Sequence, residues 1–398
     1  MRIAVIGAKG LPPLQGGIEH YCAELYPRMV AQGLSVDLFA RASYTSTVWG
    51  KRYDYKGVNV IPLPGMKMRG VDAFITSALG AIASSGNHYD IIHFHALGPS
   101  LFTFLPRVVS SSKIVVTCQG LDWQRAKWGS FSSRLIQMGE QVAVKFAHGI
   151  IVVSDALQTY FQRTYGRQTV YIPNAPASYA DSDSQFSYIQ KLGLKKGHYI
   201  LFLGRMVPEK RPDLLIEAFS KLQKTGWKLV LAGGVSDTKA YTTQLLEKIS
   251  DNPNIVFAGE LRGSRLAEIV RGAGLFALPS DLEGLPLAML EAMREGIPVI
   301  ASDIPPHQQL VAGRGILFEA GNIDSCTQAL EWSIQHPQEC AKMAKNAQTY
   351  LQNNYSWERI TSDTTRLYIK LLNTPLPQDV LQADESRESG LAGVTGKK

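Results

Sequence analysis

Residues 278–303 read LPSDLEGLPLAMLEAMREGIPVIASD and contain a strand, a loop, a helix and a second strand. The first apolar strand ends in the loop DLEGL, and Pro286 follows at the first position of a helix, where proline is well tolerated. The second strand, IPVIAS, comes directly after that helix. Apolar strands that alternate with helices in this way are typical of a parallel sheet with helices on its faces.

The same alternation runs along the whole chain and is interrupted once. The segment APASYADSDSQFSYIQ, residues 175–190, is rich in serine, aspartate and alanine, and a second set of strands and helices begins after it. The pattern predicts an α/β protein with two Rossmann-like domains. We expect a first domain over residues 1–180, a linker over 181–192, a second domain over 193–356, a helix over 357–372 that crosses back to the first domain, and a disordered tail over 373–398.

The composition is that of an ordinary globular protein. The chain has 398 residues, of which 45% are hydrophobic and 19% charged, and this length is enough for two separate cores. No apolar run reaches the ~18 residues of a membrane helix, and glycine and lysine interrupt the apolar start after Ile6, so neither a transmembrane helix nor a signal peptide is expected. The four cysteines lack C-x-x-C spacing, which predicts no disulfide framework and no zinc site. We therefore expect a cytoplasmic protein.

Basic residues concentrate in the first half of the chain. Residues 1–180 contain 17 Lys and Arg against 9 Asp and Glu. The densest patch runs from Lys51 to Arg69 and mixes cations with tyrosine, leucine and methionine, which suits adsorption to anionic lipid headgroups. A solvated basic face is the alternative explanation. No helix-turn-helix, RNP or zinc-finger pattern accompanies the patch, so no nucleic-acid partner is expected.

A glycine-rich loop, GAKGLPPLQGGIEH at residues 7–20, follows the first expected strand. A nicotinamide-dinucleotide fingerprint needs G-x-G-x-x-G in a tight turn, and the absence of this spacing argues against an oxidoreductase. What remains is the pair Gly16 and Gly17 directly before a helix, where free N–H groups and the helix dipole attract an anion. A flexible connector is the alternative for this loop taken alone.

Two cations and two carboxylates in the second half point to a phosphate-bearing ligand. Arg205 and Lys210 follow the expected strand 199–204, and open α/β sheets bind ligands at the carboxyl ends of their strands. A diphosphate bound there needs positive charge. Glu283 lies in the loop of residues 278–303 and Glu291 on its helix, where their carboxylates can accept hydroxyl protons of a sugar and of a ribose. Each residue taken singly also fits a solvent-facing position.

Two histidines lie two residues apart in the segment DIIHFHAL. His93 and His95 therefore share one face of a strand. A metal site that also uses Asp90 is disfavoured, because no further ligands with zinc-like spacing are evident. The D-x-D of residues 181–183 lies in the linker, away from any strand end, and is interpreted as solvated.

The segments GRMVPEK and SDLEGLPLAMLEAM, the second of which contains an E-x7-E element, strongly resemble the family 4 glycosyltransferases of the GT-B fold, which retain the anomeric configuration. Further similar segments follow the order of the family over nearly the whole chain: DIIHFH, IIVVSDAL, VYIPNA, NIVFAGEL, GIPVIASD and NYSWERI. The segment GLDWQRAKWG is similar to a motif of a subgroup that includes bacterial rhamnosyltransferases of surface polysaccharide synthesis. The resemblance implies two parallel sheets that face each other across a cleft.

The resemblance also implies roles for particular residues. Glu291 would take the ribose, Glu283 the donor sugar, and Leu261 would lie beside the base. His95 would face the sugar near the anomeric centre, although Ala96 stands where the family usually has an acidic or similarly polar residue. The implied catalytic residues are His95, Arg205, Lys210 and Glu283, and the implied substrate-binding residues are Gly16, Gly17, Leu261, Gly284, Leu285 and Glu291.

We therefore expect a retaining glycosyltransferase that moves a sugar from a nucleotide-diphosphate sugar to a glycan or polyprenyl-linked acceptor, without a metal or other cofactor. The resemblance implies front-face attack, in which the leaving phosphate takes the proton of the acceptor. Contact with the inner face of an anionic membrane is a further expectation. A non-hydrolysing sugar-nucleotide epimerase and a nucleotide-sugar-binding protein without turnover are the alternatives left open. The acceptor-side candidates are Glu19, His20, Trp123, Arg125 and Lys127, of which Trp123 equally fits a core anchor.

Overall fold

The computed structural model describes ten segments of the chain. They are residues 1–13, 17–45, 47, 49–65, 71–124, 129–176, 179–222, 226–234, 239–250 and 252–373. Gly16, Arg125, Lys127 and the expected tail after Asn373 lie outside the described residues. None of the helices in these segments combines the length and the apolar content that a bilayer crossing requires.

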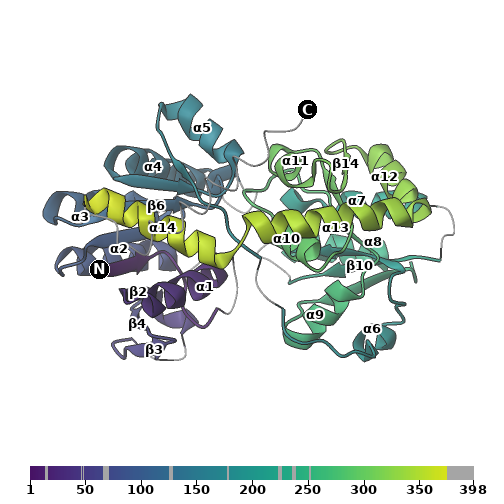
Figure 1. Ribbon diagram of the computed structural model, residues 1–398, viewed down its shortest axis with the longest axis horizontal. Helices are drawn as coiled ribbons and strands as arrows, with labels where there is room; N and C mark the ends of the chain where they lie inside the picture. The colour runs from purple at the N-terminus through teal and green to yellow at the C-terminus, as the bar shows by residue number, and fades with distance from the viewer. Residues whose placement is uncertain are drawn as a thin grey trace, which may run out of the picture.

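The first domain is built on a sheet that has eight strands in the described segments (Figure 1). Their order is β3-β4-β2-β1-β5-β6-β7-β8, and β3 pairs antiparallel with β4 while the other pairs are parallel. The strands are β1 (Arg2–Ile6), β2 (Ser35–Arg41), β3 (Tyr53–Tyr55), β4 (Val58–Leu63), β5 (Ile91–His95), β6 (Lys113–Cys118), β7 (Gly149–Val152) and β8 (Val170–Tyr171).

The second domain is built on a parallel sheet with six strands among the described residues, in the order β11-β10-β9-β12-β13-β14. The two parallel sheets confirm the expected α/β fold with two Rossmann-like domains. Residues 278–303 supply the end of one strand, a helix and the next strand, as their pattern predicts. The strands are β9 (Tyr199–Leu203), β10 (Lys228–Ala232), β11 (Ile255–Gly259), β12 (Leu275–Leu278), β13 (Val299–Ser302) and β14 (Ile316–Phe318).

Helices cover both faces of the first sheet. The chain reverses its direction along the sheet after β4, so right-handed crossovers place α1 on one face and α2, α3, α4 and α5 on the other. The helices of the first domain are α1 (Gly17–Ala31), α2 (Val71–Ser85), α3 (Phe104–Val109), α4 (Ser130–Phe146) and α5 (Asp155–Tyr165). Those that follow are α6 (Ser187–Lys191), α7 (Pro212–Lys221), α8 (Lys239–Ile249), α9 (Gly263–Arg271), α10 (Leu287–Arg294), α11 (Pro305–Val311), α12 (Ile323–Gln335), α13 (Pro337–Asn354) and α14 (Trp357–Leu372).

Helix α14, the last helix among the described residues, packs on the first domain beside α1 (Figure 1). The Ser356 hydroxyl accepts a hydrogen bond from the Arg359 amide at 3.2 Å and so caps the start of α14. Near that start, the ring centres of Trp357 and Tyr21 lie 5.7 Å apart. About one turn before the end of α14, the Tyr368 hydroxyl contacts the buried Nδ1 of His93 at 2.6 Å. Helix α14 thereby completes the core of the first domain.

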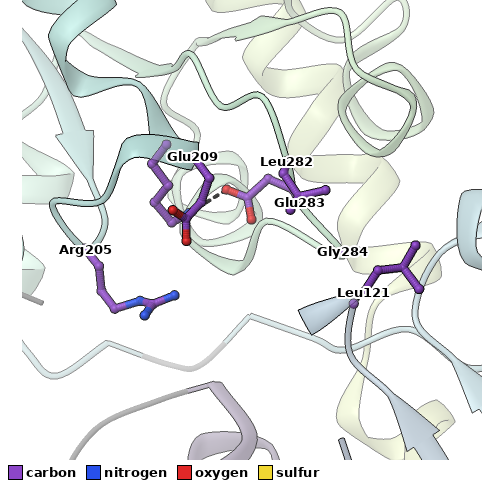
Figure 2. A pocket seen from close by; sticks show the side chains of 8 residues that line it. Leu121, Arg205, Glu209, Leu282, Glu283 and Gly284 are labelled. Carbon is purple, nitrogen blue, oxygen red and sulfur yellow. Dashed lines mark hydrogen bonds and ion pairs between the residues drawn. The ribbon is translucent and has the colours of Figure 1, made fainter. Parts of the chain in front are cut away.

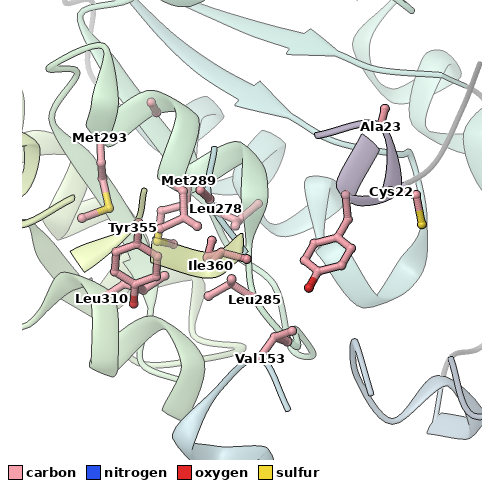
Figure 3. Packing of buried hydrophobic residues seen from close by; sticks show 14 of the residues in the cluster. Cys22, Ala23, Val153, Leu278, Leu285, Met289, Met293, Leu310, Tyr355 and Ile360 are labelled. Atoms are coloured by element: carbon pink, nitrogen blue, oxygen red, sulfur yellow. The ribbon is translucent and has the colours of Figure 1, made fainter. Parts of the chain in front are cut away.

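Helix α10 is fixed by the apolar residues on its inner face. Met289, Leu290 and Met293 are fully buried, and Figure 3 shows Met289 near Leu278 and Leu285. Each such side chain contributes roughly 1.5–3 kcal/mol when it leaves water. Because these three residues occupy the inner face, Glu291 projects from a different side of the helix.

The expected linker contains a short helix, α6, that packs on α9 of the second domain. The amide of the buried Ile189 donates a hydrogen bond to the Glu268 carboxylate at 2.9 Å. Asp183, the second aspartate of the D-x-D, accepts hydrogen bonds from the amides of Gln185 at 2.9 Å and Ser187 at 3.2 Å. This aspartate therefore shapes the approach to α6.

Candidate functional site

An ion pair joins two loops at the carboxyl edge of the second sheet. Lys210 follows β9 and Glu283 follows β12, and the Lys210 Nζ lies 2.5 Å from the Glu283 Oε1. The hydroxyl of Ser280 donates to the same carboxylate oxygen at 2.9 Å. The backbone also ties the loops together, since the Asp281 amide donates to the Glu209 carbonyl at 2.9 Å. Strands β9 and β12 are neighbours in the sheet, which is why the two loops meet.

The ion pair is largely shielded from solvent. The side chains of Lys210 and Glu283 keep 16% and 12% of their surface exposed. Burial alone would raise the pKa of Glu283, but the Lys210 ammonium and, more weakly, His307 hold this pKa below its ordinary value. Burial lowers the pKa of His307 itself to about 4, against the opposing charge of Glu283. Glu283 is therefore ionised at neutral pH and acts as a fixed acceptor.

A pocket surrounds this ion pair and takes its walls from both domains (Figure 2). The empty space around the ion pair is about 380 Å³, part of which is open solvent. Figure 2 shows the Arg205 side chain reaching toward the pocket from the end of β9. The lining residues are Gly120 and Leu121 of the first domain and Arg205, Glu209, Lys210, Leu282, Glu283 and Gly284 of the second.

The backbones of the two domains lie in close contact at Gly284. A Cβ atom at this position would lie 2.1 Å from the carbonyl oxygen of Gln119 and 3.1 Å from the Cα of Gly120. Only glycine leaves room for that backbone. Gln119 is held in turn by Asn174, whose side-chain amide donates to the Gln119 Oε1 at 2.7 Å. Leu285, beside Gly284, is buried and packs in the core.

The start of α1 faces the start of α10. A Cβ atom at Gly17 would lie 3.4 Å from the Leu287 Cδ1, so the N-terminal ends of the two helices lie close together across the domain boundary. Both ends carry free N–H groups and the positive end of a helix dipole. Gly17 therefore lies beside the start of α10, the helix that follows the loop of Glu283.

Glu291 is engaged by a residue from the connection between the domains. The Tyr179 hydroxyl donates to the Glu291 Oε2 at 2.6 Å. Burial raises the pKa of Glu291 to about 7, although Tyr179 and Arg294 oppose this shift. The carboxyl group is therefore poised to change its charge near neutral pH.

His95 lies in the core and is not among the residues that line the pocket. Its Nε2 contacts the Tyr26 hydroxyl at 2.6 Å, and its ring stacks on His93 with centres 4.2 Å apart. Burial lowers the pKa of His95 to about 3, so the imidazole is neutral. His93 has partners on both ring nitrogens, Tyr368 and Thr117 among them. The contact of His95 with a donor sugar stays a prediction.

The acceptor-side candidates have separate surroundings. Glu19 is buried and accepts a hydrogen bond from the Lys9 amide at 2.8 Å, which fixes the loop after β1. His20 is exposed. Trp123 is partly buried, and its indole N–H donates to the buried Glu140 carboxylate at 3.0 Å, as a core anchor would.

Leu261, the residue expected beside the base, follows β11 at the edge of the second sheet and is partly buried.

The structure adds Glu209 to the candidate site. Both carboxylate oxygens of Glu209 are buried and lack a hydrogen-bond partner, and the residue lines the pocket. Such an acceptor normally has a partner, so an unpaired one at a pocket marks a place for a donor group. The sequence offered a signal, since Glu209 directly precedes Lys210. Within the described residues, no three His, Cys, Asp or Glu side chains cluster in a way that would hold a metal ion.

Comparisons with known proteins cover both domains. The family profile described as Glycosyltransferase Family 4 matches residues 15–175, and that described as Glycosyl transferases group 1 matches residues 184–350. The D-inositol 3-phosphate glycosyltransferase of Gordonia bronchialis is 25% identical over 409 residues, which cover 94% of this chain and 89% of that protein.

Solved structures share the fold. The sucrose-phosphate synthase of Thermosynechococcus elongatus superposes with a TM-score of 0.79 at 20% identity, over 94% of this chain and 99% of that one. Anabaena HepE, solved in complex with UDP-glucose, superposes with a TM-score of 0.76 at 20% identity, over 92% of this chain and 99% of that one. These likenesses confirm the expected GT-B fold.

Removing Lys210 should destabilise the fold in a pH-dependent manner. A Lys210→Met variant leaves Glu283 buried without its ion-pair partner, so the pKa of Glu283 should move from below its ordinary value to above it. The free energy of unfolding should fall by about 2–3 kcal/mol near neutral pH and by less near pH 4, where Glu283 takes up a proton. Urea denaturation at both pH values measures the difference.

A Lys210→Met/Glu283→Gln double variant serves as the control. Without a buried charge it should recover part of the lost stability near neutral pH. An equal loss of stability at both pH values in the single variant would contradict the assigned charge on Glu283.

Proposed function

Since the chain belongs to glycosyltransferase family 4 and has the GT-B fold, we propose that it transfers a sugar from a nucleotide-diphosphate sugar to a glycan or lipid-linked acceptor. The observation that carries this proposal is the pocket between the domains, in which Arg205 and Lys210 lie beside Glu283. Two cations and a carboxylate fit a diphosphate and the sugar that it carries. The complex of Anabaena HepE with UDP-glucose supports a donor of this class.

The donor diphosphate would lie against Arg205 and Lys210. The Lys210 ammonium has three N–H donors, so it can bind a phosphate oxygen while it keeps its contact with Glu283. The N-terminal ends of α1 and α10, which approach each other at Gly17 and Leu287, would add backbone N–H groups. Gly16 and the amides of Gly284 and Leu285 belong to the same proposed anion site.

Three carboxylates would bind hydroxyl groups of the donor. Glu283 and Glu209 line the pocket beside the cations, and we assign them to the sugar. Glu291 would accept the hydroxyl protons of the ribose and exchange its present partner, Tyr179, for them. An ionised carboxylate accepts hydrogen bonds at both oxygens, which suits a pair of neighbouring hydroxyl groups.

Charge stabilisation is the main catalytic contribution that these residues would make. As the bond between the anomeric carbon and the phosphate oxygen breaks, negative charge grows on the diphosphate, and fixed cations at Arg205 and Lys210 stabilise it. Because side chains supply this charge, we propose that no metal is required. The family resemblance supports retention of configuration by front-face attack, with the leaving phosphate taking the acceptor proton. His95 would contribute as a neutral imidazole near the sugar.

The acceptor would enter from the first domain. The segment GLDWQRAKWG, residues 120–129, begins with the pocket residues Gly120 and Leu121. Its similarity to rhamnosyltransferases of surface polysaccharide synthesis supports a growing glycan or a polyprenyl-linked glycan as the acceptor. Glu19 and His20, at the start of α1, belong to the same proposed side of the cleft.

Calorimetric titration against a panel of UDP-, GDP-, ADP- and dTDP-sugars tests the proposed donor class. One nucleotide should bind, and Lys210→Ala or Arg205→Ala should each weaken binding by about tenfold or more, since a hydrogen bond to a charged group contributes ~1.5–3 kcal/mol. Transfer should be abolished in the Lys210→Ala variant and should persist in EDTA.

The matched control is Lys221→Ala. Lys221 is the last residue of α7, at the far end of this helix, and it forms an exposed ion pair with Asp324. This variant should bind and transfer like the wild type. Loss of transfer in EDTA with recovery in manganese would contradict metal independence. Sugar interconversion without an acceptor would identify an epimerase, and binding without any turnover would identify a binding protein.

The pH dependence of donor binding tests Glu291. Its pKa of about 7 means that the carboxylate form, which accepts both ribose hydroxyl protons, becomes dominant as the pH rises through that value. Donor affinity in the wild type should therefore increase several-fold between about pH 6 and pH 8. The Glu291→Gln variant should bind weakly with a flat pH profile, and an unchanged slope in this variant would exclude the ribose assignment.

Glu209 is tested by comparing two ligands. A Glu209→Gln variant should bind the sugar nucleotide several-fold more weakly than the wild type, because the carboxylate accepts hydroxyl protons of the sugar. Its affinity for the corresponding nucleoside diphosphate should stay unchanged. Glu217→Gln, on the partly exposed face of α7, is the control. Equal weakening for both ligands would show that Glu209 does not act on the sugar.

A further inference from the structure

Exposed apolar side chains gather on the helices that cover one face of the first sheet. Of the twelve large hydrophobic residues that are most exposed in the described segments, eight lie on α2, α3 and α4. Val108 and Phe131 keep 74% and 76% of their surface exposed. Six of these residues define what we term the α2–α4 face: Phe74, Ile82, Phe104, Val108, Val109 and Phe131.

Helix α2 has the reverse of the usual amphipathic arrangement. Its buried residues are small or polar, and Thr76, Ser77 and Ser84 satisfy their hydroxyl groups on carbonyls of their own helix. Its outer side carries Phe74 and Ile82. A helix at a water interface normally places such residues inside. Because α2 presents them outward, the surface is suited to an apolar environment.

The three helices form one continuous surface. Helix α2 packs on α3, and α3 packs on α4. The rings of Phe74 on α2 and Phe102, just before α3, meet edge to face with centres 4.8 Å apart. Phe104 on α3 lies 6.3 Å, centre to centre, from Phe146 at the end of α4. A contiguous apolar surface of this kind marks an interaction site.

The exposed charges on these helices all have one sign. Asp72 and Glu140 are the acidic residues of α2, α3 and α4, and both are buried. Arg107, Arg134 and Lys145 are exposed. Apolar side chains interspersed with cations match the interface of an anionic bilayer, where rings and aliphatic groups enter the headgroup region and cations bind phosphate groups.

We infer that the α2–α4 face docks on an anionic lipid bilayer. A second copy of the chain fits this face less well, because a two-fold symmetric contact would bring the three cations of one copy against those of the other. The docked orientation also suits the cleft. Helices α2 and α4 begin near the carboxyl edge of the first sheet, where Gly120 and Leu121 line the pocket. On the basis of the proposed function, a lipid-linked acceptor would reach the pocket along this edge.

The inference moves the expected membrane contact to other residues. The sequence placed it on the patch from Lys51 to Arg69, part of which lies outside the described residues. Lys51 and Arg52 are exposed beside β3, at the opposite edge of the first sheet from β7 and β8. Among the described residues, none of the twelve most exposed large hydrophobic side chains lies between Lys51 and Gly65, whereas six of them form the α2–α4 face, which therefore matches a bilayer better.

Sedimentation with lipid vesicles tests the inference on the full chain. The protein should bind vesicles of phosphatidylcholine with about 30% phosphatidylglycerol, bind phosphatidylcholine alone weakly, and lose binding in about 0.5 M salt. A Val108→Ser/Val109→Ser variant and an Arg134→Glu/Lys145→Glu variant should each reduce vesicle binding about tenfold or more. Urea denaturation verifies that both variants fold, as the exposure of these side chains predicts.

The control variants are Lys342→Glu/Lys345→Glu, exposed on α13 of the second domain, and Lys51→Glu/Arg52→Glu. Both should bind vesicles nearly as well as the wild type. Absence of vesicle binding, equal binding by all variants, or light scattering that shows a dimer lost in Val108→Ser/Val109→Ser would overturn the inference. Donor titration of the same variants in solution separates the two proposals, since donor binding should be unchanged whether or not vesicles bind.

Discussion

The ion pair between Lys210 and Glu283 depends on a particular order of strands. Lys210 and Glu283 are 73 residues apart in sequence. They lie in the loops after β9 and β12, and these two strands are adjacent in the sheet. Only a crossover that returns β12 to the side of β9 brings these loops together. The ion pair holds the loop that contains Gly284, and Gly284 in turn meets the backbone of Gln119 in the first domain. The position of Gly284 at the domain boundary thus depends on an ion pair between two loops of the second domain.

Local patterns in the sequence account for much of this arrangement. The alternation of strands and helices places Arg205, Lys210 and Glu283 at the carboxyl edge of a parallel sheet. The position of β12 beside β9, which brings them together, comes from the observed strand order. Glycine at position 284 could be expected near an anion, but its contact with Gln119 could not. That contact depends on how the two domains lie against each other. The spacing of apolar residues within either domain does not predict this arrangement.

Side chains that meet across long distances were beyond the reach of sequence patterns. Tyr179 bonds to Glu291 from the segment between the domains, and nothing near either residue indicates the pairing. The face on which His95 projects follows from strand alternation, yet its partner Tyr26 is set by the docking of α1. Helix α2 is a second example of a feature that sequence patterns do not predict. Its outer apolar residues lie at helical spacing, and spacing does not tell which side of a helix meets the sheet.

The placement of α14 has a consequence for synthesis of the chain on the ribosome. The buried group of Tyr21, Tyr26 and His93 belongs to the first domain, but Trp357 and Tyr368 close it. Domains usually fold in the order in which they emerge. Here the first domain to emerge is covered by α14, so the side of the domain that holds Tyr21 and His93 stays uncovered until residues 357–368 have been synthesised. A nascent chain that has not yet reached α14 therefore exposes aromatic and polar groups that α14 covers in the folded protein.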